Sequence, residues 1–292
     1  MNKKTSNLKL LFIVNPGSGK GEINFSEVIG TYCTDKQQDF ELYELKKNCS
    51  LAKIKAVIEQ SGAQRVIAVG GDGTLKMVAE CVLETDMPIG LIPAGSANGM
   101  ARELNIPENA EEALHIAINA KPKKIHAIVA NGELCIHLAD IGFNAYLVKK
   151  FDGLPHRGKL AYAKAAWMAL WNHYKLDVEF KIKDQTIRSK AAMVVIANAT
   201  MYGTGVKINP EGHLDDDFFE VILVKEYSVM EILKLRFTNL PFNPKNIESF
   251  QTTDLSIKTR HKAHFQVDGE YIGKLNNVKA HIIKDAINII AP

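Results

Sequence analysis

Three glycine-rich segments of the chain combine residue types that can hold a phosphate group. They are residues 15–20, 70–74 and 93–102, and each follows an apolar run of strand length. Glycine lets the backbone approach a ligand closely, because no Cβ stands in the way. Where such a turn leads into a helix, free N–H groups and the helix dipole attract an anion. The three segments therefore predict an anion site of the kind that holds phosphates.

The segment at residues 70–74 reads Gly-Gly-Asp-Gly-Thr and carries the strongest signal. Asp-Gly alone is a common turn pair, but three glycines around one acid exceed what a turn needs. Asp72 would lie beside the phosphates, where a carboxylate has a purpose only with a metal ion or a proton to move. We consider Asp72 a candidate for either task.

The other two segments are weaker signals when taken singly. Residues 15–20 offer glycines, a hydroxyl group and Lys20, but they lack the spacing of a P-loop. In residues 93–102, Ser96 or Asn98 could simply cap the following helix. The candidate phosphate-binding residues of all three segments are Asn15, Pro16, Gly17, Ser18, Gly19, Lys20, Gly70, Gly71, Asp72, Gly73, Thr74, Gly95, Ser96, Asn98 and Arg102.

Strand and helix patterns alternate over about the first 120 residues, and these elements must position the three segments. We expect strands at residues 8–14, 40–45, 65–69 and 88–92, and helices at 51–58, 75–84, 99–104 and 109–120. Repeated strand–helix units imply right-handed crossovers and a parallel sheet that is covered on both faces. Ligands of such sheets bind at the carboxyl ends of the strands, so the three segments should converge on one crevice.

The alternation of strand and helix patterns ends after Lys124, at a basic stretch that contains proline. Asn131-Gly132 lies between two apolar runs and is a strong hairpin signal. We expect strands at residues 125–130, 133–139, 178–183, 187–197, 218–224, 263–267 and 278–283, with helices at 159–174 and from Ser228 onward. This half of the chain predicts an antiparallel β domain.

Two acidic motifs of the second half have an ordinary and a functional interpretation. Asp268-Gly269-Glu270 and the run at residues 214–217 could be a hairpin turn and a solvated acidic turn. A cluster of carboxylates can also bind a hard cation through oxygen. Likewise, Trp167 and Trp171 could pack in the core or line a surface for a greasy substrate.

Composition narrows the class of protein. The chain has 292 residues, of which 46% are hydrophobic and 24% charged, and its net charge is +3 with no concentrated basic patch. This argues against nucleic-acid binding. The four cysteines form no CxxC pair, which favours free thiols in a reducing, cytoplasmic compartment. We find neither a signal peptide nor a run of about 18 apolar residues, so we expect any membrane contact to be peripheral.

Together the motifs resemble the lipid kinases of the diacylglycerol kinase catalytic-domain family, which includes bacterial diacylglycerol kinases and sphingosine kinases. The matching segments are residues 15–19, 70–74, 93–102, 140–145, 214–216 and 267–275. The resemblance implies an α/β nucleotide-binding domain with a parallel sheet at residues 1–122 and an antiparallel β-sandwich lipid-substrate domain at 123–284. It also implies that the tail at 285–292 packs back on the first domain.

The resemblance further implies ATP and Mg²⁺ as cofactors and a lipid alcohol at a membrane surface as the acceptor. Glu270 is then the first choice of general base, with Asp72 as the rival. A second, structural Mg²⁺ would lie near residues 213–218, with Asp216 as a side-chain ligand, carbonyl groups of His213 and Phe218 beside it, and Asp215 as a weaker ligand.

This chain departs from the family pattern at two acidic positions. Gly99 stands where an acid is common, and Asp217 replaces a usual glycine, which bears on the second Mg²⁺. Gly95-Ser96 looks more like sphingosine-kinase members, so diacylglycerol, a sphingoid base and other lipid alcohols stay open. The alternatives are an NAD kinase, a non-catalytic nucleotide-binding module and, least favoured, a purely structural protein. The oligomeric state is open, with a homodimer as one option.

Overall fold

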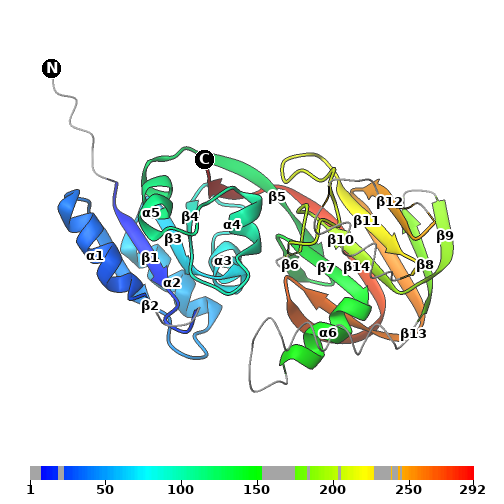
Figure 1. Ribbon diagram of the computed structural model, residues 1–292. Coiled ribbons are helices and arrows are strands. Elements are labelled where there is room, and N and C mark those ends of the chain that lie inside the picture. The colour runs from blue at the N-terminus through cyan, green and yellow to red at the C-terminus, as the bar shows by residue number, and fades with distance from the viewer. Residues whose placement is uncertain are drawn as a thin grey trace. The chain divides into compact units, whose positions relative to one another are not determined.

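The computed structural model describes residues 8–18, 23–152, 175–182, 185–202, 205–226, 238, 243 and 245–292. The chain forms two compact units (Figure 1). The first consists of Met1–Ile125 and Asp285–Pro292, and the second of His126–Lys284. The helices expected at residues 159–174 and from Ser228 onward lie outside the described residues.

The first unit contains the parallel sheet that the sequence predicts. Its strands are β1 (Leu10–Val14), β2 (Phe40–Glu44), β3 (Arg65–Gly70) and β4 (Pro88–Pro93), in the order β2-β1-β3-β4 (Figure 1). The end of the last strand, β14 (Glu270–Ile290), pairs in parallel with β4 through Asn288 and Ile289. All five residues of β1 are buried, as expected for a strand that is covered on both faces.

The described residues of this unit form five helices: α1 (Phe25–Asp35), α2 (Leu51–Ser61), α3 (Asp72–Cys81), α4 (Gly99–Glu103) and α5 (Ala110–Asn119). Helix α2 packs on α3, and α1 packs on α5. Right-handed crossovers place these pairs on opposite faces of the sheet. Ser50 caps α2, since its side chain accepts a hydrogen bond from the Lys53 N–H. Helix α1 is not among the elements that the sequence pattern predicts.

The second unit contains the antiparallel strands. The order β12-β11-β10-β7-β13-β14 is formed by β12 (Ile247–Thr252), β11 (Phe219–Val224), β10 (Met193–Ala197), β7 (Leu138–Gly142), β13 (Asp254–Val267) and β14. Strand β8 (Leu176–Ile182) pairs with β13 and β9 (Gln185–Ala191), while β5 (Pro122–Ala130) pairs with β6 (Glu133–Cys135) and β14. The predicted Asn131-Gly132 hairpin joins β5 to β6, with positive φ at both turn residues.

Alternation along β10 shows how the second unit builds its core. Val194 and Ile196 enter one buried cluster with Phe180, Phe219 and Phe265. The intervening residues, Met193, Val195 and Ala197, enter a second cluster with Phe143 and Leu147 of α6 (Phe143–Asp152). Because successive side chains of a strand point to opposite faces, this sheet is buried on both sides.

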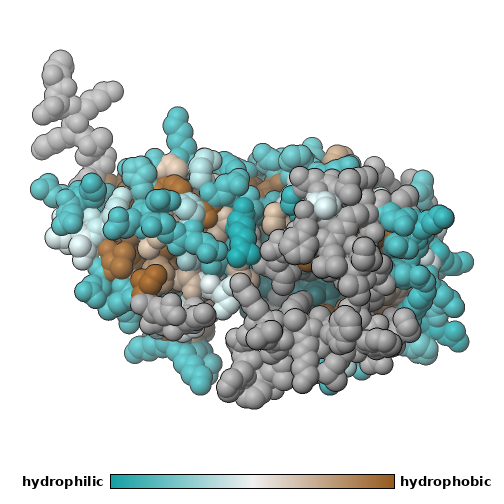
Figure 2. Space-filling view, in the orientation of Figure 1, coloured by the Kyte–Doolittle hydropathy of each residue, from teal (hydrophilic) through white to brown (hydrophobic). Residues whose placement is uncertain are grey.

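The described residues include few large apolar side chains that are exposed. On the face in Figure 2, the coloured surface is mostly hydrophilic, with separate brown patches. The exposed large hydrophobic residues are Ile23, Leu42, Leu51, Phe218 and Ile272. No helix in the described part of the chain is long and apolar enough to cross a membrane. All four cysteines are free thiols.

Candidate functional site

Asn15 shapes the first glycine-rich loop and ties it to the second. Its Oδ1 accepts a hydrogen bond from the Gly17 N–H over 3.1 Å, which holds the turn. Its Nδ2 donates to Thr74 Oγ1 over 3.1 Å, and its N–H donates to the Val69 carbonyl over 2.9 Å. The predicted phosphate contacts at Gly19 and Lys20 lie outside the described residues.

The second loop, residues 70–74, begins helix α3. Gly71 is the N-cap of this helix, and no side-chain hydrogen bond caps it in the described structure. The first N–H groups of a helix have no partner within the helix, so an uncapped start is suited to an anion. A Cβ at Gly70 would lie 2.2 Å from Thr74 Oγ1, so the close packing of this loop requires glycine there.

Asp72 joins the second loop to the third. Its two carboxylate oxygens accept hydrogen bonds from the backbone N–H groups of Gly99 and Met100, each over 2.9 Å. Those groups begin helix α4, whose N-cap Asn98 has a left-handed backbone and no side-chain cap of its own. A carboxylate from α3 thus caps α4, and a proton-abstracting role would compete with both bonds.

Gly95 brings the third loop into backbone contact with the second. A Cβ at Gly95 would lie 2.5 Å from the Gly71 Cα, and the Ala94 N–H donates to the Gly70 carbonyl over 2.9 Å. Asn98 closes the turn, because its Oδ1 accepts from the Gly95 N–H and its Nδ2 donates to the Gly95 carbonyl. The three loops therefore meet within the first unit.

The sequence pattern does not predict that Lys76, on the helix that follows the second loop, is buried. Lys76 on α3 is 3% exposed, and no other lysine or arginine of the described residues is buried. The helical pattern offered no signal, since a lysine between apolar positions is usually on the solvated face. By contrast, the side chain of Arg102 is 41% exposed and pairs with Glu108 at 3.3 Å.

In the second unit, the Asp268-Gly269 turn presents Glu270. Asp268 and Gly269 have φ values of 49° and 85°, which is the two-residue hairpin geometry that Asp-Gly favours. The Asp268 carboxylate accepts three backbone N–H groups at 3.0–3.1 Å, from Ile136, His137 and Leu138. These bonds also explain why the single strand expected at residues 133–139 is two strands, β6 and β7. Glu270 itself is exposed.

A buried acid, Asp140, is linked to the same turn by hydrogen bonds through Gln266. The Gly269 N–H donates to Gln266 Oε1 over 2.7 Å, and Gln266 Nε2 donates to Asp140. Burial raises the pKa of Asp140 to about 6, although four donors stabilise its charged form. These donors are Asn144 Nδ2, Gln266 Nε2, the Ala145 N–H and Tyr202 Oη. Hydrogen bonds therefore fix the turn that carries Glu270.

The loop at residues 213–218 contains the predicted structural metal ligands. Asp216 Oδ1 accepts a hydrogen bond from the Phe218 N–H over 3.2 Å. Asp217 pairs with Lys284 at 2.6 Å and faces His126 Nε2 at 3.9 Å, and the Lys284 hydrogen bond lowers the Asp217 pKa. No group of three His, Cys, Asp or Glu side chains in the described part of the chain could hold a metal ion. A cation there would need backbone carbonyls and water for most of its ligands.

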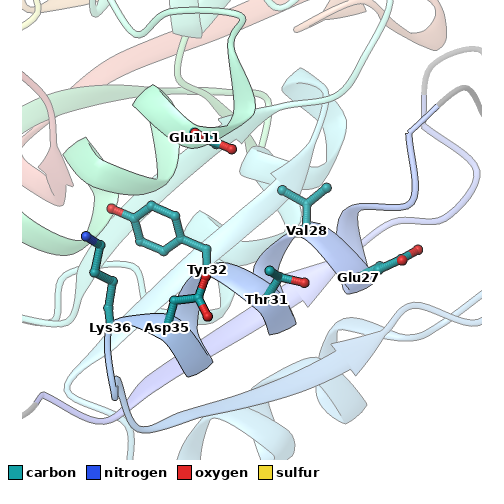
Figure 3. Close-up of a pocket in the computed structure, with 7 residues that line it drawn as sticks. All are labelled: Glu27, Val28, Thr31, Tyr32, Asp35, Lys36 and Glu111. Carbon is teal, nitrogen blue, oxygen red and sulfur yellow. The ribbon is translucent and has the colours of Figure 1, made fainter.

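A pocket elsewhere on the first unit does not fit phosphate. Its volume is about 470 Å³, and it is lined by residues of α1, by Lys36 that follows α1, and by Glu111 of α5 (Figure 3). Three carboxylates, those of Glu27, Asp35 and Glu111, face this pocket against one amine, that of Lys36. They would repel a polyphosphate, and none of the predicted phosphate-binding residues lines it.

Comparison with known families divides the chain much as the structure does. Residues 9–130 match the family described as "Diacylglycerol kinase catalytic domain". Residues 139–291 match the family described as "YegS C-terminal NAD kinase beta sandwich-like domain". The first match includes all three glycine-rich loops, and the second includes the Asp268-Gly269-Glu270 turn.

Individual relatives agree with these matches. A protein of Chromohalobacter salexigens named "Probable lipid kinase YegS-like" is 26% identical over 80% of this chain and 78% of its own length. A Bacillus subtilis protein named "Diacylglycerol kinase" is 24% identical over 78% of this chain and 77% of its own. A crystal structure of a diacylglycerol kinase from Bacillus anthracis has the same fold, with a TM-score of 0.75 and 19% identity over 99% of this chain and 98% of that one.

Proposed function

Because the chain belongs to the lipid kinases that join a diacylglycerol kinase catalytic domain to a YegS-type β-sandwich domain, we propose that it transfers the γ-phosphate of ATP to a lipid hydroxyl group. The observation that carries this proposal is the meeting of three glycine-rich loops in the first unit. Asn15 donates a hydrogen bond to Thr74, the Gly71 and Gly95 backbones lie too close for a Cβ at Gly95, and Asp72 caps α4. Loops held this way suit the positioning that phosphoryl transfer requires.

In this proposal the loops hold the triphosphate of ATP. Gly71 and Gly95 keep side chains out of the way, so that phosphate oxygens reach backbone N–H groups. The start of α3 adds its dipole to this attraction. Mg²⁺, when bound with ATP, supplies neutralising charge to the outer phosphate oxygens. Asp216, Asp215 and the carbonyl groups of His213 and Phe218 stay as the proposed ligands of a second, structural Mg²⁺.

Glu270 is the proposed general base. As the lipid oxygen bonds to the γ-phosphorus and the bond to ADP breaks, the hydroxyl proton passes to the Glu270 carboxylate. Glu270 is exposed at the start of β14, where a substrate can reach it. Its rival Asp72 already accepts two backbone N–H bonds, which favours a positioning role for that residue. The turn below Glu270 is fixed by Asp268 and Gln266, as a positioned base requires.

The acceptor in this proposal is a lipid alcohol at a membrane surface, with diacylglycerol and a sphingoid base as the leading choices. The relatives named above are lipid and diacylglycerol kinases. A protein without a spanning helix in its described part would meet such a substrate through peripheral contact.

One labelling experiment tests the proposal. Purified protein is incubated with γ-labelled ATP, Mg²⁺ and a total lipid extract, with NAD⁺ in a parallel reaction. We expect label in one organic-extractable product, which mass spectrometry then identifies as a phosphorylated lipid. Label in NADP⁺ instead would replace the lipid kinase proposal with NAD kinase activity. Tight ATP binding without label in any lipid would overturn the activity and favour a nucleotide-binding module.

A further inference from the structure

Two buried polar residues on neighbouring strands are hydrogen-bonded to the turn that carries Glu270. Asp140 on β7 lies opposite Gln266 on β13 in the antiparallel pairing of these strands, and the two residues are 0% and 2% exposed. Gln266 Nε2 donates a hydrogen bond to Asp140, and Gln266 Oε1 accepts the Gly269 N–H over 2.7 Å. Side-chain hydrogen bonds therefore connect an acid inside the sheet to the residue that precedes Glu270.

The amide group of Gln266 can hold this turn in only one of its two orientations. Its oxygen accepts a hydrogen bond, whereas its NH₂ group only donates and would meet the Gly269 N–H donor against donor. Asp140 selects the orientation. Burial raises the pKa of Asp140 to about 6, so at neutral pH the group is mostly ionised, and a carboxylate has only acceptor oxygens. The NH₂ end of Gln266 must therefore face Asp140, which leaves its oxygen for the turn.

The two turn residues before Glu270 are held in different ways. The Asp268 carboxylate accepts the N–H groups of residues 136–138, which fixes the first turn residue. Gly269 is exposed, and a Cβ there would meet nothing within 4 Å in the described structure, so packing does not hold it in place. The hydrogen bond to Gln266 supplies the restraint on Gly269 that packing does not.

We propose that Asp140 and Gln266 are positioning residues for phosphoryl transfer, which hold the peptide between Gly269 and Glu270 so that the Glu270 carboxylate stays within reach of the acceptor hydroxyl. This inference rests on the proposed function, in which Glu270 takes the hydroxyl proton. Neither positioning residue is among the candidate site residues that the sequence suggests, and both act through Glu270. A general base works only within hydrogen-bond reach of the proton, so a base on a loosened turn spends less of its time in place.

The simplest alternative is a purely structural role, in which Asp140 only secures the start of helix α6. Its carboxylate accepts the Ala145 N–H over 2.8 Å and Asn144 Nδ2 over 2.6 Å, and both donors lie in the first turn of α6. The chain offers a matched pair of donors, because Asn144 and Gln266 donate to the same oxygen, Asp140 Oδ2. A structural role predicts that losing either donor lowers stability alone. A positioning role predicts that only the loss of Gln266 lowers kcat.

The test is a double-mutant cycle between Gln266→Met and Glu270→Gln in the full chain, followed by steady-state kinetics at neutral pH with the lipid that the labelling experiment identifies. Gln266→Met keeps the length of the side chain and removes both hydrogen bonds. We expect kcat to fall by about 10- to 100-fold with the KM for ATP unchanged. In the Glu270→Gln background the same change should cause no further fall, because the base through which Gln266 acts is gone. Asn144→Ala is the matched control and should keep the wild-type kcat.

Hydrogen exchange at the Gly269 N–H, measured by NMR, is a second readout that needs no activity. We expect exchange to be at least about 10-fold faster in Gln266→Met than in wild type or Asn144→Ala. Asp140→Asn, which no longer selects one amide orientation, provides the same comparisons if the methionine variant fails to fold.

Three results would overturn the inference while the kinase proposal stands. They are unchanged exchange at Gly269, an equal loss of kcat in Asn144→Ala, and losses that multiply when Gln266→Met and Glu270→Gln are combined. If wild-type protein labels no lipid, the kinase proposal fails, and the positioning role fails with it.

Discussion

Asp72 Oδ2 accepts a hydrogen bond from the backbone N–H of Gly99 over 2.9 Å, which makes an acid on α3 the cap of helix α4. The second oxygen accepts the Met100 N–H over the same distance. Both bonds join the start of α4 to a loop that follows a different strand.

Replacing Asp72 by Asn should therefore cost stability as well as activity. The amide keeps one acceptor oxygen, but its NH₂ group faces a second backbone donor. We expect a loss of about 1.5–3 kcal/mol in the free energy of unfolding, measured by urea denaturation, because a charged acceptor is lost. The KM for ATP should rise, since the third loop is no longer held against the second.

Asp86→Asn is the matched control for this variant. Asp86 forms a surface ion pair with Lys124 at 3.1 Å and its side chain is 89% exposed, so its loss should cost less than about 1 kcal/mol. An Asp72→Asn protein with wild-type stability and ATP affinity but very low kcat would reverse our assignment and make Asp72 the base.

Gly95→Ala should separate two of the loops. The new Cβ would lie 2.5 Å from the Gly71 Cα, and backbone atoms cannot yield as a flexible side chain can. We expect about 1–3 kcal/mol of destabilisation and weaker binding of ATP, measured by thermal unfolding and calorimetry. In Gly30→Ala the new Cβ meets nothing within 4 Å on helix α1, so that variant should be slightly more stable than wild type. Undiminished ATP affinity in Gly95→Ala would contradict a nucleotide site at these loops.

Glu270→Gln should lower kcat by about 10²–10⁴-fold while ATP affinity stays at the wild-type value, because the amide cannot accept the proton. Steady-state kinetics with the identified lipid gives kcat, and calorimetry gives the affinity. Glu179→Gln, which breaks a surface pair with Arg188, should leave both unchanged. A Glu270→Gln protein that turns over normally would remove Glu270 from the mechanism.

Asp140 should make stability depend on pH. Its pKa rises from 3.8 to about 6 on folding, so the folded state holds the proton more tightly. The stabilisation is present below about pH 4 and is lost as pH rises through about 6. The unfolding free energy of wild type minus that of Asp140→Asn should therefore fall by about 3 kcal/mol between about pH 4 and pH 7. A constant difference across this range would show that Asp140 does not titrate as burial implies.

The parallel sheet could be predicted because its strands are short apolar runs between glycine turns, and strand ends of such a sheet share one edge. That rule alone brings residues 15, 71 and 95 together. Helix α1 could not be predicted in the same way, since Gly30, Thr31 and Thr34 are weak helix formers. It packs on α5, and the one local signal of its start is Asn24, whose side chain accepts the Glu27 N–H.

The roles of individual residues depended on the fold more than on the motif. Asp72 belongs to a recognisable glycine loop, yet its partners at residues 99 and 100 follow a different strand. Lys76 looks like a solvated helix position until tertiary packing covers it. Asp268 belongs to a recognisable turn pair. Its hydrogen bonds to residues 136–138 join segments more than 120 positions apart, and no local sequence pattern predicts such bonds.

Because β14 pairs with β4, the sheet of the first unit can be completed only after the second unit has been synthesised. The first unit takes its outer strand from residues near 288, and Ile287, Ile289 and Ile290 are buried there. When residues 1–125 have been synthesised, that strand has not yet been made. Until translation reaches the last residues, β4 has an unpaired edge that invites association with other chains. A premature stop shortly before residue 285 would leave that edge open for good.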